Sequence, residues 1–192
     1  TADKVRQGVQ QAAAGGYSVD NSLRFNDDDS AYLSRTPSSA GNRKTWTWSG
    51  WVKLGNLGIT RDLMSTISGD EDLIRFSSSD TLKIMFHGGT YGNLATTQVF
   101  RDTSAWYHII VSIDTTLSTA GNRIRLYVNG IEVTDFTSNT NPSQDYQTYI
   151  NSTSTQYLSK KSNQSKWYHD GYLSEVHFID GQALDPTSFG ET

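Results

Sequence analysis

The segment 167–170 combines the side-chain types that sugar recognition requires. It consists of Trp167, Tyr168, His169 and Asp170 and lies in a predicted loop. Aromatic rings stack on the apolar C–H patches of a pyranose, and its hydroxyl groups bond to amides and carboxylates. The segment therefore predicts contact with a glycan. The competing interpretation is that these rings pin a long loop onto the edge of the domain.

A second group of aromatic side chains occurs in the long polar stretch 137–166. Tyr146, Tyr149 and Tyr157 interrupt a run rich in Ser, Thr, Asn and Gln, and Tyr91 lies in another Gly-rich loop. We include the three tyrosines of the polar stretch in the candidate glycan site. Tyrosine-rich loops with many Ser and Asn residues also suit protein recognition, so another protein is the alternative partner.

One dense acidic cluster consists of Asn26, Asp27, Asp28 and Asp29. Carboxylate and amide oxygens are the ligands that calcium prefers, so Ca2+ is the one ion considered for this cluster. The spacing differs from that of a calcium loop of the EF-hand type. A solvated turn between two strands explains the cluster equally well, because Asp and Asn favour turns. No other cofactor is expected.

The remaining chemistry-bearing residues form no catalytic pattern. The four histidines are far apart in the sequence, without HxH or HxxxH spacing, and the chain has no cysteine. Each histidine is therefore expected to be a hydrogen-bonded strand or loop residue rather than a metal ligand. Neither a Gly-x-Ser-x-Gly turn nor a phosphate-binding loop is present. We expect no enzymatic activity.

Length and charge restrict the number of domains and the partners. A chain of 192 residues suits one all-β domain, and its net charge of -4 with scattered Lys and Arg offers no basic face for nucleic acid. No apolar run approaches the ~20 residues of a membrane-spanning helix, so membrane insertion is not expected. The absence of cysteine excludes disulfides and thiolate metal sites.

Residues 1–16 differ in composition from the rest. Val5, Val9 and the alanines at 12–14 recur at helical spacing and precede a pair of glycines. We expect a short helical or extended tether over residues 1–16 and a single domain over residues 17–192. The tether would pack on a neighbouring subunit, and a frayed tail is the alternative.

The rest of the sequence alternates apolar and polar residues with the period of two that half-buried strands require. Clear examples are residues 45–53, 81–87 and 107–113. Within 123–136, Asn129 and Gly130 supply the positive φ angles of a tight hairpin turn, after which the chain is expected to return as a strand. These features predict an all-β sandwich.

Four of these segments resemble, in the same order, strands of laminin-G-like domains with the concanavalin A-like fold. They are Trp46–Lys53, Trp106–Asp114, Asn122–Val133 and Gly171–Asp180. The resemblance extends over about residues 18–190. It implies an all-β, two-sheet antiparallel jelly-roll sandwich. Many domains of this family hold calcium at the rim of the sandwich, which keeps the calcium interpretation of the acidic cluster open.

Glucanases share this jelly roll, and their catalytic strand carries the pattern Glu-x-Asp-x-x-Glu. Its carboxylates lie on one face of a strand and hydrolyse the glycosidic bond together. None of the four glutamates of this chain, Glu71, Glu132, Glu175 and Glu191, occurs in that pattern. A glycan hydrolase is therefore the less favoured interpretation.

The segment Gly171–Glu191 is similar to a run found in virion proteins of tailed bacteriophages. Those proteins carry the jelly roll on tail fibres, appendages or the capsid surface. The resemblance implies a non-enzymatic virion structural module that attaches to host glycan or to other virion proteins and assembles as a homo-oligomer. Such a module would be made in the host cytoplasm without a signal peptide. A free carbohydrate-binding, lectin-like module is the alternative.

Overall fold

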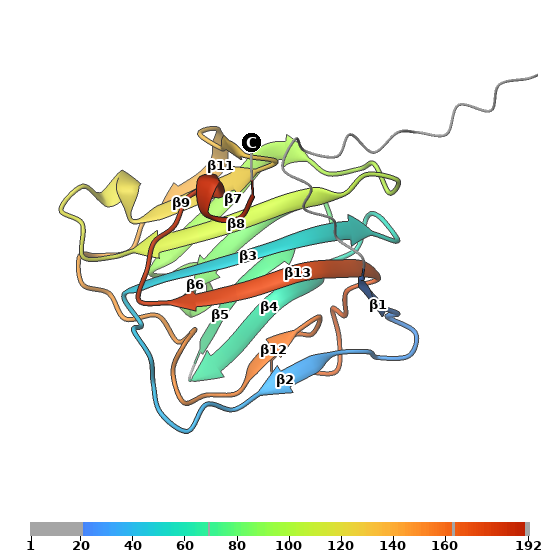
Figure 1. Cartoon of the computed structure of the whole chain (residues 1–192), viewed down its shortest axis with the longest axis horizontal. Helices are drawn as coiled ribbons and strands as arrows, with labels where there is room; N and C mark the ends of the chain where they lie inside the picture. The colour runs from blue at the N-terminus through green and yellow to red at the C-terminus, as the bar shows by residue number, and fades with distance from the viewer. Residues whose placement is uncertain (1–20, 69, 163, 191–192) are drawn as a thin grey trace, which may run out of the picture.

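Two antiparallel β-sheets packed face to face form the domain (Figure 1). The computed structural model describes residues 21–190 apart from residues 69 and 163. This architecture confirms the predicted all-β jelly-roll sandwich. No helix in the described part of the chain is long and apolar enough to cross a membrane.

The six-stranded sheet, here called sheet A, has the strand order β1–β13–β3–β8–β9–β10. Its strands are β1 (Leu23–Phe25), β3 (Thr45–Leu54), β8 (Tyr107–Asp114), β9 (Ile124–Val128), β10 (Ile131–Glu132) and β13 (Gly171–Asp180). The seven-stranded sheet B has the order β11–β7–β6–β5–β4–β12–β2. Its strands are β2 (Leu33–Arg35), β4 (Arg61–Ser68), β5 (Asp70–Phe76), β6 (Thr81–Phe86), β7 (Gly92–Val99), β11 (Phe136–Thr140) and β12 (Gln156–Leu158). Short 3-10 turns are η1 (His87–Gly89), η2 (Ala120–Asn122) and η3 (Pro186–Ser188).

Alternating apolar residues of the two sheets meet in one core. Trp46 and Trp48 of β3 are almost fully buried, as are Ile84 and Phe86 of β6. The rings of Trp46 and Phe86 meet edge to face with centroids 6.3 Å apart. The Trp46 indole N–H donates to Thr148 Oγ1 at 3.0 Å, so its polar atom is satisfied inside the core. The period-two pattern therefore identifies the inward faces of these strands.

The hairpin at Asn129 and Gly130 forms as predicted, with φ angles of 51° and 80°. Asn129 Oδ1 also accepts the backbone N–H of His108 at 2.8 Å. The returning strand is shorter than expected, because β10 contains only two residues. The chain then leaves sheet A, and β11 begins at Phe136 in sheet B.

Sheet B contains strands that the sequence pattern does not reveal. The predicted loop 137–166 holds most of β11 and all of β12, and β12 lies between β2 and β4. The segment after β12 folds back over sheet B, where the Ser65 hydroxyl donates to the carbonyl oxygen of Lys160 at 2.6 Å. Because both faces of β4 are covered, its residues 61–66 are all buried, polar and apolar alike.

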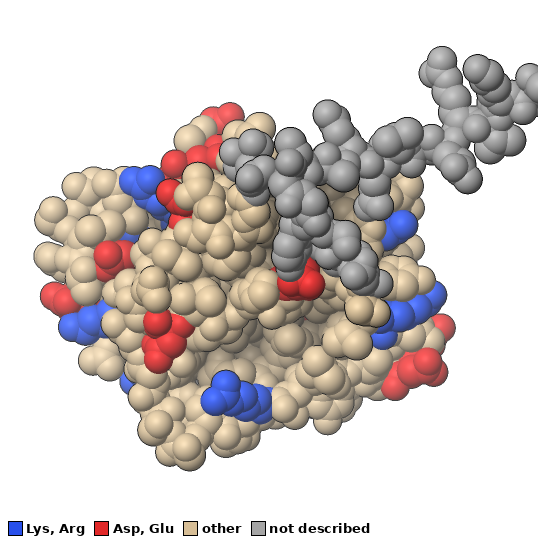
Figure 2. All heavy atoms as spheres, in the orientation of Figure 1, with Lys and Arg blue, Asp and Glu red and all other residues tan. Residues whose placement is uncertain are grey.

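The tether predicted for residues 1–16 lies outside the described residues, so it stays a prediction together with the boundary at residue 17. Basic and acidic side chains are interspersed over the face of the domain shown in Figure 2. That face therefore carries no extended stripe of one charge sign, which nucleic-acid recognition would use.

Candidate functional site

An aromatic platform lies at the end of sheet B where β6 passes into β7. It comprises His87 and Tyr91 around η1, and Tyr146 and Tyr149 from the loop before β12. The Tyr91 ring centroid lies 4.8 Å from that of His87 and 5.3 Å from that of Tyr146. The centroids of His87 and Tyr149 are 6.0 Å apart. We call these four residues the tyrosine rim; Tyr91 is 47% exposed, and the others are half-buried.

The turn that positions Tyr91 depends on glycine. His87, Gly88 and Gly89 have φ angles of 52°, 62° and 95°, in the left-handed region that favours glycine. Three such residues in succession reverse the chain tightly after β6. A Cβ atom at Gly92 would lie 2.6 Å from Phe86 Cδ2, so the strand that follows Tyr91 also requires a glycine at its start.

A buried carboxylate connects the two halves of the tyrosine rim. Asp72 is fully buried, and its Oδ1 accepts the backbone N–H of His87 at 2.8 Å. Its Oδ2 accepts the backbone N–H groups of Tyr149 and of Ile150. Burial raises the pKa of Asp72 to about 6, although the three hydrogen bonds and the charge of Arg43 oppose that shift. One carboxylate thus fixes both segments that carry the rings.

Arg43 borders the tyrosine rim next to Tyr149. Its guanidinium carbon lies 5.6 Å from the Tyr149 ring centroid, and its Nε donates to the carbonyl oxygen of Thr148. Burial raises the pKa of Tyr146 well above its usual range, so this phenol stays neutral and can donate a hydrogen bond. The rim therefore offers ring faces, neutral hydroxyl groups and one cation, a combination that suits the apolar patches and hydroxyl groups of a sugar.

Trp167, from the segment 167–170, has a different environment because cations surround its ring. The guanidinium carbon of Arg75 lies 4.2 Å from the ring centroid, and the Nζ atoms of Lys161 and Lys166 each lie 4.3 Å from it. We call these four residues the tryptophan patch. Arg75 is itself fixed by Asp62, which accepts hydrogen bonds of 2.7 and 3.0 Å. This arrangement favours the loop-pinning interpretation for Trp167.

The other residues of the segment lie in separate surroundings. Tyr168 is 8% exposed and His169 is 0% exposed. Burial, assisted by the charge of Arg61, lowers the pKa of His169 to about 3, so its imidazole is neutral. Asp170 is half-buried, and its carboxylate lies 3.7 Å from the Arg24 guanidinium. The segment therefore presents no single surface, and an enclosed His169 leaves no atom for a sugar to contact.

Tyr157 belongs to a third aromatic group. Its ring centroid lies 6.0 Å from that of Tyr32, and Lys160 Nζ lies 4.9 Å from the first ring and 4.5 Å from the second. Tyr32 also lies 6.3 Å from Tyr168, measured between ring centroids. The seven residues predicted for glycan binding are thus distributed over several places. The structure brings together Tyr146 and Tyr149, places Tyr157 near Tyr168, and separates Trp167, His169 and Asp170.

The acidic cluster Asn26–Asp29 forms a turn after β1. Asn26 Nδ2 donates to Asp29 Oδ2 at 2.7 Å, and Asp27 Oδ2 accepts from Asn56 Nδ2 at 3.1 Å. Within the described ranges, no three His, Cys, Asp or Glu side chains gather as a metal site requires. The hydrogen bonds account for the turn, and calcium binding at this cluster stays a prediction.

The family of the chain follows from comparison with known proteins. A family model described as the concanavalin A-like lectin/glucanases superfamily matches residues 25–188, which include both sheets and the tyrosine rim. The chain belongs to this family. The laminin-G-like resemblance in the sequence is confirmed at this level. No curated protein sequence matches the chain significantly.

Solved structures share the fold of this family member at low sequence identity. A native heptameric SAP-like pentraxin from Limulus polyphemus is 16% identical, with a TM-score of 0.57 over 80% of this chain and 70% of that chain. The CBM40 of a Ruminococcus gnavus IT-sialidase, bound to α2,3-sialyllactose, is 12% identical, with a TM-score of 0.53 over 83% and 96%. Domain 4 of a Geobacillus stearothermophilus GH43 extracellular arabinanase, in complex with arabinotriose, is 16% identical, with a TM-score of 0.54 over 78% and 66%.

These similarities establish the fold and not a shared ligand. The chain spans 40% and 21% of the length of two other similar chains, so it corresponds to only a part of those proteins. The ligands of the solved relatives therefore enter only as support for a proposal.

Four residues of the tyrosine rim and its support were not included in the predicted site. The sequence places Tyr91 only in another Gly-rich loop. His87 precedes a glycine pair and could have been found from its proximity to Tyr91 in the same Gly-rich loop. Arg43 is a single cation in a polar segment and gives no such signal. Asp72 falls in a stretch that resembles a polar loop, and its role depends on hydrogen bonds to distant segments.

Proposed function

We propose that this domain is a non-enzymatic module that binds glycan at the tyrosine rim. The observation that carries the proposal is the 47% exposed ring of Tyr91, held between the rings of His87 and Tyr146. A ring that is fixed before binding loses little conformational freedom when a sugar stacks on it. The sialyllactose and arabinotriose bound by two structural relatives support a glycan as the class of ligand.

The burial and hydrogen bonds of Asp72, the carboxylate that supports the tyrosine rim, support binding without hydrolysis. Hydrolysis of a glycosidic bond by the usual route needs a pair of carboxyl groups that flank the bond. Asp72 is fully buried, and both of its oxygens accept backbone N–H groups. It therefore cannot reach a bond in a sugar stacked on Tyr91.

We further propose that the module is carried on a tailed-phage particle, in a tail fibre, an appendage or a capsid decoration. The support is the similarity of Gly171–Glu191 to virion proteins; its described part forms the long strand β13 and the turn η3. In such a particle the tyrosine rim would face host glycan, and other surfaces would contact virion proteins or further copies of the chain. A free lectin-like module is the second candidate, because the rim is assembled within one chain.

Glycan binding is tested with the purified full chain on a glycan array, followed by titration calorimetry with the best ligand. Tyr91→Ala removes the exposed ring, and we expect at least tenfold weaker binding. Tyr32→Ala is the matched control, because Tyr32 is also exposed, at 43%, but lies outside the tyrosine rim. Absence of any glycan ligand, or equal losses in the two variants, would contradict the proposal.

The virion assignment is tested separately by cryo-electron microscopy of purified particles that contain the protein. Density for the domain with the tyrosine rim directed outward is the expected result. Absence of the chain from the particles would overturn the virion assignment and leave the free lectin-like module. Burial of the rim against other subunits would instead contradict host attachment.

A further inference from the structure

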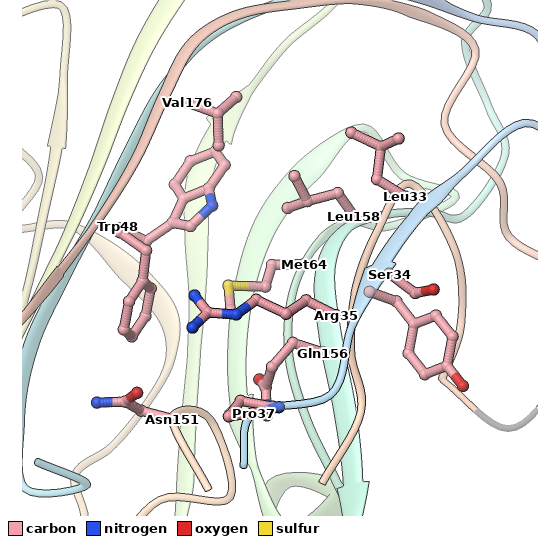
Figure 3. Close-up of a pocket in the computed structure, with 12 residues that line it drawn as sticks. Leu33, Ser34, Arg35, Pro37, Trp48, Met64, Asn151, Gln156, Leu158 and Val176 are labelled. Carbon is pink, nitrogen blue, oxygen red and sulfur yellow. The ribbon is translucent and has the colours of Figure 1, made fainter. Parts of the chain in front are cut away.

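Among the described residues, both sheets end in short strands along one side of the sandwich. β1 has only three residues and pairs with residues 171–173 of β13, so residues 175–180 of β13 have no described strand on that side. On the other sheet, the marginal strands β12 and β2 also have three residues each. A pocket of about 260 Å³ opens between the sheets at this place (Figure 3).

The walls of this inter-sheet pocket are mainly apolar. Figure 3 shows Trp48 and Val176 on the side of sheet A, and Met64, Leu158 and Leu33 on the side of sheet B. A second pocket of about 320 Å³ adjoins the first, because three residues line both pockets. The shared residues are Leu33, Leu158 and Val176.

Apolar surface remains exposed to water at the mouth of these pockets. Leu33 is 47% exposed and Leu23, which lines the second pocket, is 56% exposed. These exposed leucines line adjoining pockets. An apolar ligand that covered them would remove apolar surface from water, which is favourable. An aliphatic chain that runs from the first pocket into the second would cover these leucines.

Among the described residues, two buried polar atoms without a hydrogen-bond partner belong to side chains that line the first pocket. Trp48 is 1% exposed, yet its Nε1 has no hydrogen-bond partner, and neither has the buried Oε1 of Gln156. Arg35 and Gln156 are direct register partners on β2 and β12. Figure 3 shows the Arg35 guanidinium directed across the pocket toward Trp48. Buried donors without acceptors are costly, so the Trp48 indole N–H indicates a ligand group that accepts a hydrogen bond.

We propose that the inter-sheet pocket binds a small amphiphile with an aliphatic chain and a carboxylate head. The carboxylate would pair with the Arg35 guanidinium and accept the Trp48 indole N–H. The chain would extend past Leu158 and Val176 into the second pocket. Glu175 lines that second pocket, with its carboxylate 3.3 Å from His177 Nε2, so an acidic side chain lies at that end and the carboxylate head is placed at the Arg35 end. This site is separate from the tyrosine rim and does not depend on the proposed glycan function.

The proposal is tested by calorimetric titration of the full chain with decanoate, below the concentration at which decanoate forms micelles. We expect binding of one decanoate per chain, and roughly tenfold weaker binding of octanoate because two methylene groups are lost. Arg35→Gln should weaken decanoate binding at least tenfold and leave decanol binding within twofold. Arg125→Gln is the control, since Arg125 is another solvent-accessible arginine, with its side chain 42% exposed, but lies on β9 in the other sheet.

A second variant tests the location of the aliphatic chain. Val176→Phe places a larger side chain between the two pockets, and we expect it to weaken decanoate and decanol alike; circular dichroism checks that it folds. The proposal is overturned if decanoate does not bind at millimolar concentration, or if Arg35→Gln and Arg125→Gln bind it equally. Binding that appears only after deletion of residues 1–16 would also overturn it, because that segment would then be the occupant of the pocket.

Discussion

The tyrosine rim and the tryptophan patch both combine aromatic rings with cations, and they leave different surfaces to a ligand. In the rim, one arginine lies 5.6 Å from one ring centroid, and the Tyr91 ring stays 47% exposed. In the patch, three cations lie within 4.3 Å of the single ring of Trp167. The cations lie over the Trp167 ring and leave the Tyr91 ring accessible, so under the proposed function the rim offers a ring face for a sugar and the patch does not.

The largest expected effect is the loss of stability when Arg75, a cation of the tryptophan patch, is replaced. Arg75→Met removes the partner of Asp62, whose side chain is 0% exposed, and leaves an unpaired carboxylate inside the protein. We expect the free energy of unfolding to fall by about 3–5 kcal/mol, because breaking a buried pair leaves an uncompensated charge. Urea denaturation measures this loss, and calorimetry at low temperature should show unchanged glycan affinity. Lost affinity at unchanged stability would make the patch, not the rim, the binding site.

The next effect concerns the support of the tyrosine rim. Asp72→Ala leaves three backbone N–H groups without an acceptor, and we expect the free energy of unfolding to fall by about 2–3 kcal/mol. Glycan binding should weaken at least tenfold, since Tyr149 and His87 lose their common anchor. Asp72→Asn keeps the shape and one acceptor oxygen and should lose less on both measures. If a folded Asp72→Ala protein kept full glycan affinity, the tyrosine rim would not depend on Asp72 for binding.

A smaller effect of Asp72 is expected in the pH dependence of stability. Its pKa is about 6 in the folded protein, above the ordinary value of 3.8, so the folded state binds this proton more tightly than the unfolded state. Lowering the pH from 7 to 5 should therefore raise the free energy of unfolding through this group by about 1 kcal/mol. Urea denaturation at pH 7 and pH 5 should show this increase in the free energy of unfolding for the wild type relative to Asp72→Asn. His169, whose pKa is lowered, opposes the gain equally in both proteins.

The smallest effect concerns a single exposed cation of the tryptophan patch. Lys166→Ala removes one of the three charges around Trp167, and we expect a stability change below about 1 kcal/mol. Glycan affinity should stay within twofold of the wild type, because the other two cations still cover the ring. If glycan bound clearly more tightly to this variant, Lys166 alone would be what prevents the tryptophan patch from binding a sugar.

The strands of sheet A were predictable because most of them alternate apolar and polar residues, the pattern that indicates a half-buried strand. β3 and β8 present apolar residues to the core with a period of two, and Asn129 and Gly130 are typical residues for the tight turn between β9 and β10. β4 breaks that rule, since its Arg61 and Asp62 are buried. Their neighbours, Asp80 and Arg75, come from other segments, so the sequence of β4 alone does not show that it is covered on both faces.

The types of residue in the candidate site were predictable from the sequence, but their assembly into one surface was not. Tyr146 and Tyr149 were expected to contact glycan, and Tyr91 was noted in another loop, but nothing local links these positions. Trp167 looked equally suitable because the three cations around it are not apparent from its immediate neighbours alone. The chemistry of a site can thus be inferred from composition, whereas its assembly depends on contacts between distant segments.

The position of Asp72 has a consequence for the order of folding. Its carboxylate joins segments that are 15 and 77 residues away along the chain, and closing the longer loop has an entropic cost that local turns avoid. The turn at His87 should therefore form before the segment at Tyr149 joins it. Under the proposed function, a labelled glycan added during refolding in a stopped-flow instrument would bind only after both segments have joined at Asp72, so it would report the closure of the longer loop.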